Sequence, residues 1–321
     1  MFKREFAGVG RRPDVALREP RRRDFVRSVT ALAASTWLAI GVASARAAAH
    51  SPALEQSPTL QRIATSGLIH VGYIPTPGTF AFRAADGATV GYSVEICAHV
   101  VDNIRKALAR PDLRVVWRPL APPERIPFLK AGTIDIDCGG NTNTVARQKD
   151  VDFSFTFFTT GTRFLVRQPL QFQGAGTLWK RTVAVTAGTT AQGIVERLGR
   201  EQGVKEVVVA SDGDGVKLVE NGQADAFAQD DALLYGLMAR SKVRDSLGVT
   251  GNFLTVEPYA FMLPKGDAAF REIFDRTLGE MMHSGELLAL YRKWFDTDAL
   301  RIPMNVYMKE NLAFPSRYGV P

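Results

Sequence analysis

The sequence predicts an α/β fold in which parallel sheets are covered by helices on both faces. Segments with strand-like patterns alternate with amphipathic helical segments along most of the 321 residues. Four of the predicted strands end at Ile74, Gly139, Gly188 and Asp230. Because ligands of such folds collect at the carboxyl ends of the strands, we expect a binding site built from these separate segments.

The first predicted elements follow from local punctuation and from apolar spacing. Residues 59–67 are expected to form a short helix that a glycine ends, and residues 68–74 form the first strand. A helix then starts at residues 91–93, because apolar residues recur after it every three or four positions. A strand at 114–117 follows, and prolines 122 and 123 suit the start of a helix that runs through 125–130.

Residues 131–155 are expected to form a strand, a loop, a short helix and a second strand. Ile134, Ile136 and Cys138 alternate with Asp135 and Asp137, which is the period of a pleated strand. Two glycines then break that strand.

A short helix is expected after these glycines. Thr142 or Thr144 can cap it, and it carries Arg147. A glycine loop with free N–H groups, hydroxyls and one guanidinium suits a carboxylate. An ordinary strand–turn–helix with a surface arginine is the alternative that the spacing alone leaves open.

The second half of the chain repeats the alternation. Predicted strands cover residues 161–167, 183–185, 207–209 and 224–228, and residues 253–263 are extended. Predicted helices follow the turn 188–190, cover 215–221, start after 229–231, and cover 268–283 and 286–295. A tail that contains prolines ends the chain.

The basic charge of the chain belongs to its start. Ten of the 40 basic and four of the 33 acidic residues lie within residues 1–47, so the rest carries a formal charge of +1. The net charge of +7 therefore gives no support for nucleic-acid or membrane-surface binding by the folded part.

Residues 1–47 are expected to be an export signal. A basic start precedes an apolar run at 28–45 that is too short and too diluted to span a membrane. Arginines 22 and 23 lie in a sequence that resembles a twin-arginine export motif, and a general secretory signal is the alternative. We expect cleavage after Ala47 or Ala49, a linker at 48–58, and a soluble product in the periplasm.

The two cysteines, Cys97 and Cys138, leave two possibilities open. An oxidising compartment permits a disulfide between them. Their expected positions, on the buried face of a helix and at a strand end, favour two separate buried thiols.

Motifs along nearly all of the chain after the leader, roughly residues 60–314, carry a family resemblance. They are Gly91-Tyr92-Ser93, Pro111-Asp112-Leu113, Arg125-Ile126-Pro127, Cys138-Gly139, Asn143 with Arg147-Gln148-Lys149, Gly161-Thr162-Arg163, Val185-Thr186 with Gly188-Thr189-Thr190, Asp230-Asp231-Ala232-Leu233-Leu234, Met262-Leu263 and Lys293-Trp294-Phe295. In this order they resemble the periplasmic amino-acid-binding proteins of ABC importers (solute-binding protein family 3). The glutamate/aspartate-binding type is the most similar pattern.

This resemblance implies a type II periplasmic-binding-protein-like fold, with two α/β lobes joined by two crossing strands. Lobe 1 would comprise residues 59–160 and 258–321, and lobe 2 residues 161–257. The ligand would bind between the lobes and close them, and a monomer in the closed form would dock on the membrane permease.

The resemblance also assigns roles to individual residues. Arg147 would grip the α-carboxylate of an amino acid with a bidentate fork, helped by Thr142. Thr190 and the N–H groups of its turn would meet that carboxylate from the other lobe, and Asp230 would bind the α-ammonium group. Each of these residues could instead be a capping residue or a solvated charge.

The side-chain end of the expected pocket departs from the glutamate/aspartate pattern. In those relatives an arginine stands at Ile74, serines stand at Pro122 and Gly140, and a histidine stands at Asp212, whereas Arg125 is retained. Losing several charge-assisted hydrogen bonds, at about 1.5–3 kcal/mol each, should weaken glutamate binding. Pairing of Arg125 with Asp212 would leave a more neutral pocket.

We therefore expect an amino acid whose side chain need not be anionic. Glutamate and aspartate stay candidates because Arg125 is present.

Other function classes find little support in the sequence. The four histidines form no metal-spaced cluster, the carboxylates of a calcium loop are missing around residues 210–221, and no lysine follows the turn 188–190 for a phosphate-binding loop. No cofactor is expected. The rival hypothesis is a secreted enzyme on the same fold, such as a cyclohexadienyl dehydratase, with Asp212 or Glu124 as the acid or base.

Overall fold

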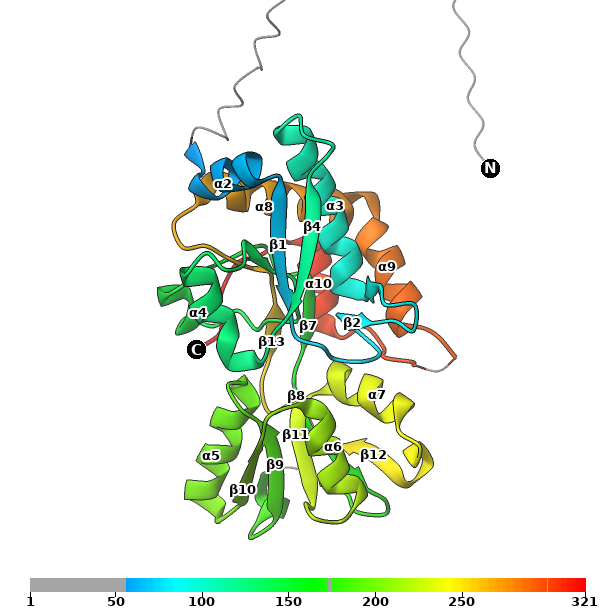
Figure 1. Cartoon of the computed structure of the whole chain (residues 1–321). Coiled ribbons are helices and arrows are strands. Elements are labelled where there is room, and N and C mark those ends of the chain that lie inside the picture. Colours follow the sequence, from blue (N-terminus) through cyan, green and yellow to red (C-terminus); the bar gives the residue numbers. More distant parts are fainter. Residues whose placement is uncertain (1–55, 173–174, 299) are drawn as a thin grey trace, which may run out of the picture. The chain divides into compact units, whose positions relative to one another are not determined.

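The computed structural model of the chain describes residues 56–172, 175–298 and 300–321. The described chain is an α/β protein with two five-stranded sheets, each packed against helices (Figure 1). Two antiparallel strands, β7 (Phe158–Thr160) and β13 (Glu257–Tyr259), form a separate pair that joins the two lobes. The predicted export signal lies outside the described residues, as does most of the predicted linker.

The first sheet has the strand order β4-β1-β5-β14-β6. Its strands are β1 (Leu68–Tyr73), β4 (Arg114–Pro119), β5 (Ile136–Asp137), β6 (Asp152–Phe153) and β14 (Met262–Leu263). The helices of this part are α2 (Pro58–Ser66), α3 (Tyr92–Ala107), α4 (Arg125–Lys130), α8 (Ala268–Ser284), α9 (Glu286–Phe295) and α10 (Val306–Ala313). A small hairpin, β2 (Phe82–Arg83) and β3 (Thr89–Val90), and two 3₁₀ turns, η1 (Pro122–Glu124) and η2 (Arg147–Lys149), complete it.

The second sheet has the order β10-β9-β11-β8-β12. Its strands are β8 (Thr162–Arg167), β9 (Thr182–Thr186), β10 (Lys205–Val209), β11 (Ala226–Asp230) and β12 (Leu247–Thr250). Its helices are α5 (Thr190–Gln202), α6 (Asp212–Glu220) and α7 (Asp231–Arg240), with 3₁₀ turns η3 (Ala175–Leu178) and η4 (Arg244–Ser246).

The α/β fold is as predicted, but the sheets are mixed and not parallel as the alternation of strands and helices implied. Strands β1, β4 and β5 are parallel, but β14 runs antiparallel to β5 and β6. In the second sheet, β8 runs antiparallel to both β11 and β12. Both exceptions directly follow a crossing strand, β8 after β7 and β14 after β13. Each crossing brings the chain into its new sheet against the direction of the neighbouring strands.

The predicted end of α2 at Gly67 and the predicted start of α3 after Gly91 are confirmed. The Ser57 hydroxyl accepts the Leu60 N–H at the start of α2, and Gly67 ends the helix with a φ of 71°. Before α3, Gly91 has a φ of 139°, and a Cβ there would lie 2.0 Å from the Phe80 carbonyl oxygen. Only glycine fits this close approach of two backbone segments.

The buried faces agree with the apolar spacing. Ile96, Val100 and Ile104 of α3 are fully buried in a core shared with α8 and α9. The crossing strand adds Phe158, whose ring lies 4.8 Å from that of Phe295 between centroids. Of the phenylalanines around residue 155, Phe153, Phe157 and Phe158 are buried, while Phe155 is half-buried.

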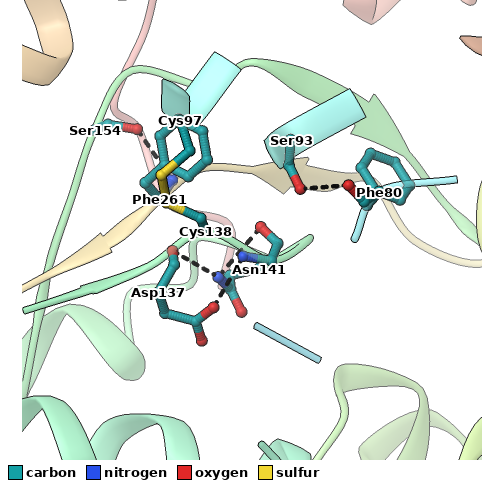
Figure 2. Close-up of a disulfide and its surroundings, with 9 residues drawn as sticks. Phe80, Ser93, Cys97, Asp137, Cys138, Asn141, Ser154 and Phe261 are labelled. Carbon is teal, nitrogen blue, oxygen red and sulfur yellow. Dashed lines mark hydrogen bonds between the residues drawn. A yellow bond between two sulfur atoms is a disulfide. The ribbon is translucent and has the colours of Figure 1, made fainter. Parts of the chain in front are cut away.

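Cys97 and Cys138 form a disulfide, so the prediction of two separate thiols is wrong (Figure 2). Both are fully buried, as expected. Helix α3 packs so that its buried face lies beside the end of β5, and the two Cα atoms are 6.2 Å apart. This distance suits a disulfide, and only the packing of the helix on the sheet determines it.

The end of the chain is more ordered than the predicted tail. Helix α10 was not predicted, and the last residues pair with the loop before η2. The Val145 N–H donates to the Val320 carbonyl at 2.9 Å, and the Val320 N–H donates to the Asn143 carbonyl at 3.0 Å. Among the described residues no helix has the length and apolar character needed to cross a membrane.

Candidate functional site

One pocket lies where the loops of both sheets meet beside the crossing strand β13. All eight residues predicted from the sequence line it: Arg147, Asp230, Thr142, Thr190, Arg125, Gly140, Ile74 and Asp212. Residues outside that prediction also line it: Thr76, Phe80, Pro122, Thr189, Gln229, Leu233 and Tyr259. Residues at or next to the predicted strand ends therefore line one pocket, and their role in binding stays a prediction.

Arg147 is positioned by the loop that precedes it. The Thr144 hydroxyl accepts the Arg147 N–H at 3.1 Å, so Thr144 rather than Thr142 caps this turn. The guanidinium donates from Nη1 to the Thr142 carbonyl at 2.9 Å and from Nη2 to the Gly188 carbonyl at 3.4 Å. Within the described residues, the other three of its five N–H groups have no acceptor. Burial lowers the pKa of Arg147, but an arginine in a protein stays charged.

Asp230 ends β11 and precedes α7, where its carboxylate is buried. The Tyr259 hydroxyl donates to Oδ2, and the Thr162 hydroxyl donates to Oδ1 at 3.2 Å. Burial and then the nearby charge of Glu257 raise the pKa of Asp230 well above its usual value. A cation placed beside Asp230 would offset both effects, because an opposite charge favours the ionised carboxylate.

Glu257 and Tyr259 are functional candidates that the sequence reasoning missed. Glu257 is buried on β13, and its Oε2 accepts the Thr190 hydroxyl at 2.9 Å. Tyr259 lies two residues further along the same strand and lines the pocket. The predicted lobe crossing near Glu257 was a signal that this residue lies close to the ligand site. Residues i and i+2 of a strand face the same side, so the same signal could have identified Tyr259.

Arg125 is held at its end of the pocket by three acceptors. Nε donates to the Pro122 carbonyl at 2.8 Å, Nη1 to Asn141 Oδ1 at 2.7 Å, and Nη2 to the Gly188 carbonyl at 3.2 Å. Burial, followed by the like charge of Arg147, lowers the pKa of Arg125 to about 10. It is therefore a cation at neutral pH.

Asp212 does not form the ion pair with Arg125 that we considered from the sequence. Its Oδ1 accepts the Thr186 hydroxyl at 2.6 Å and the Gln229 side-chain amide at 2.8 Å. Burial raises the pKa of Asp212, and Arg125 lowers it in part by its charge. The two groups therefore interact through space without a direct contact.

The floor behind the pocket is fixed by Asp137 and Asn141, on either side of the glycine pair (Figure 2). Asp137 is fully buried, and its Oδ1 accepts the Gly139 N–H at 2.9 Å. Asn141 donates to the Gly139 carbonyl at 3.3 Å and accepts from Arg125. A Cβ at Gly140 would lie 2.6 Å from the Tyr259 ring, so glycine lets that ring reach the pocket.

Glu124, which was considered as the acid or base of an enzyme, has a structural contact. Glu124 Oε2 accepts the Ala121 N–H at 2.8 Å, which caps the turn that starts at Pro122. No group of His, Cys, Asp and Glu in the described part of the chain is arranged to hold a metal ion. The pocket therefore offers cationic and anionic side chains, and both donors and acceptors of hydrogen bonds, which suit recognition of a zwitterion.

Several known proteins are similar to this chain. A relative from Pseudomonas aeruginosa, named L-glutamate/L-aspartate-binding protein, is 33% identical over 88% of this chain and 97% of its own length. The glutamate/aspartate import solute-binding protein of Escherichia coli is 36% identical over 82% of this chain and 87% of its own length. Among solved structures, a mutant of ArgBP from T. maritima has a TM-score of 0.67 and 25% identity, and the match covers 74% of this chain and all of that one.

Residues 69–297 match the family described as bacterial extracellular solute-binding proteins, family 3. This range includes both sheets apart from Leu68, the two crossing strands and every residue that lines the pocket. The chain therefore belongs to the bacterial extracellular solute-binding proteins of family 3.

Proposed function

We propose that the protein captures a polar amino acid between its two lobes outside the cytoplasm and delivers it to an ABC importer. The observation that carries this proposal is that Arg147, on the turn η2 between β5 and β6, and Asp230, at the end of β11 in the other sheet, line one pocket with side chains of opposite charge type. The relatives that are named glutamate/aspartate-binding proteins support the class of ligand and make glutamate and aspartate candidates.

The α-carboxylate lies against Arg147 in this proposal. The Arg147 guanidinium has N–H groups without an acceptor among the described residues, and Thr142 belongs to the same loop. Thr189 and Thr190 line the pocket from the start of α5, where the first N–H groups of a helix lack helical acceptors and favour an anion.

The α-ammonium group lies against Asp230, with Glu257 nearby. Burial and the nearby charge of Glu257 raise the pKa of Asp230, and a cation beside these two buried carboxylates would offset both effects.

The family fold supports lobe boundaries near the crossing strands. We place lobe 1 at residues 59–160 and 258–321 and lobe 2 at residues 161–257. The reason is that Thr160 pairs with Glu257 in the antiparallel pair of β7 and β13, by which the chain passes between the lobes. Closure about these strands would bring Arg147 and Thr190 onto the same ligand. The remaining parts of the proposal are a monomer, a permease partner, and release into the periplasm after cleavage near Ala47–Ala49.

Binding, rather than catalysis, is the function that the relatives share: both are named for binding amino acids. The two acids considered for an enzyme also have structural roles. Glu124 caps a turn, and Asp212 accepts two hydrogen bonds from its own lobe. The chain is accordingly a binding protein and not an enzyme.

Calorimetry and thermal-shift measurements with the twenty amino acids test the proposal. A ligand that binds only the folded protein raises the melting temperature. Replacing Asp230 by asparagine removes a charge-assisted hydrogen bond and should weaken binding about 10- to 100-fold. Asp245→Asn is the control, because its side chain is exposed and does not line the pocket. Absence of binding by every amino acid, or unchanged affinity in Asp230→Asn, would refute the proposal.

A further inference from the structure

The two oxygens of Asp212 have different surroundings. Oδ1 accepts hydrogen bonds from both Thr186 and Gln229. Within the described residues no donor contacts Oδ2, although the side chain is buried and lines the pocket. A carboxylate oxygen can accept about two hydrogen bonds, so Oδ2 keeps its capacity for a ligand.

Gln229 determines the polarity of this arrangement. Its Oε1 accepts the backbone N–H of Asp230 at 3.0 Å, and a backbone N–H can only donate. The amide nitrogen of Gln229 must therefore point toward Asp212, where it donates to Oδ1. The Asp230 backbone N–H, which does not titrate, thus orients the Gln229 amide so that Asp212 Oδ1 must accept a hydrogen bond from it.

Arg125 supplies the opposite polarity in the same pocket. Three of its five N–H groups donate to Pro122, Asn141 and Gly188, which leaves two without an acceptor in the part of the chain that the structure describes. Ile74 and Pro122 also line this region but have no side-chain donors. The side-chain end of the pocket therefore offers a donor from Arg125 and an acceptor from Asp212.

The charges of the pocket disfavour a further anion. Its lining contains two guanidiniums, Arg125 and Arg147, and two carboxylates, Asp212 and Asp230. The buried carboxylates of Glu257 and Asp137 lie just behind this lining, and among the described residues Asp137 Oδ2 has no hydrogen-bond partner. A zwitterion with an uncharged side chain leaves the net charge of the pocket unchanged. A second ligand carboxylate adds a negative charge near Asp212.

We infer that the site selects an amino acid with an uncharged carboxamide side chain over the corresponding acid. The carboxamide oxygen accepts from Arg125, and its NH₂ group donates to Asp212 Oδ2. A carboxylate can satisfy Arg125 but has no proton for Asp212. A cationic side chain can satisfy Asp212 but meets the charge of Arg125. This inference rests on the proposed function and adds the class of side chain to it.

Glutamine, asparagine, glutamate, aspartate, arginine and lysine are the probes of a calorimetric test at pH 8. The purified protein is compared with Asp212→Asn, and with Asp214→Asn as a matched control. Asp214 lies on the same helix, pairs with exposed Lys217 and does not line the pocket. The better carboxamide should bind about tenfold or more tightly than its acid, the effect of one charge-assisted hydrogen bond. Asp212→Asn should reduce this ratio by about tenfold or more, and Asp214→Asn should keep it.

Each other result has a distinct meaning. Equal or tighter binding of the acids, or tightest binding of a cationic amino acid, overturns the carboxamide inference and leaves the proposed function in place. An unchanged ratio in Asp212→Asn also overturns it, because another group must then select the side chain. Binding of no amino acid by the wild type overturns the proposed function and this inference together.

Discussion

The last residues of the chain brace the loop that carries Arg147. The Asn143 side chain donates to the Arg317 carbonyl at 2.9 Å, and Val320 exchanges two backbone hydrogen bonds with Asn143 and Val145. Arg317 is anchored in turn by an ion pair with Asp275 on α8 at 3.0 Å. We predict that removal of residues 317–321 weakens amino-acid binding more than it weakens the fold.

The magnitude follows from these contacts. Three hydrogen bonds of ordinary length, at about 1 kcal/mol each, restrain the loop by about 3 kcal/mol. If the free loop then spends most of its time in other conformations, affinity falls by at most about 100-fold. The unfolding free energy should change by about 1 kcal/mol or less, because the truncated chain no longer has to order these five residues on folding, which offsets the lost bonds.

Gly319→Ala provides a milder version of the same perturbation. A Cβ there would lie 2.8 Å from Gln148 Nε2 and 3.0 Å from Asn143 Oδ1. The tail must shift by a few tenths of an ångström, so we expect an intermediate loss of affinity. Tyr318→Ala is the control, because that side chain is 88% exposed.

Calorimetry with the best amino-acid ligand, urea unfolding, and hydrogen exchange at Val145 measure these effects. The truncated protein should exchange the Val145 amide faster, since that N–H loses its acceptor on Val320. Affinity unchanged in the truncated protein would refute the reasoning. So would a loss of affinity accompanied by a loss of several kcal/mol in the unfolding free energy.

Three further predictions concern the disulfide, pH and packing. Replacing Cys97 and Cys138 by alanine should lower the unfolding free energy in urea by about 4 kcal/mol, from the loop entropy of a 41-residue separation, and a loss under 1 kcal/mol would contradict this. The raised pKa of Asp230 means that the folded state binds more protons above pH 4, so its contribution to stability is lost as pH rises. Between pH 4 and 8 the unfolding free energy of the ligand-free protein should therefore fall relative to that of Asp230→Asn, and a rise would contradict the sign. Gly140→Ala places a methyl group 2.6 Å from the Tyr259 ring and should cost about 1–3 kcal/mol in unfolding free energy and weaken binding, whereas unaltered values would show that the ring moves freely.

Much of the fold and of the site lining could be predicted from the sequence. Strand and helix alternation, the glycine that ends α2 and the buried stripe of α3 are local features, because periodicity and caps depend on neighbouring residues. The convergence of Ile74 and Asp230 on one pocket also follows, since loops at the carboxyl ends of strands gather at one edge.

The tertiary structure decided what depends on contacts between distant segments. The sequence did not predict that β14 reverses direction, that Cys97 meets Cys138, or that Val320 holds the loop before Arg147. Nor did it predict that Glu257 accepts the Thr190 hydroxyl. Local patterns determine which residues form an element and which face is buried. The partners of a face depend on how separate elements pack, which no short stretch of sequence specifies.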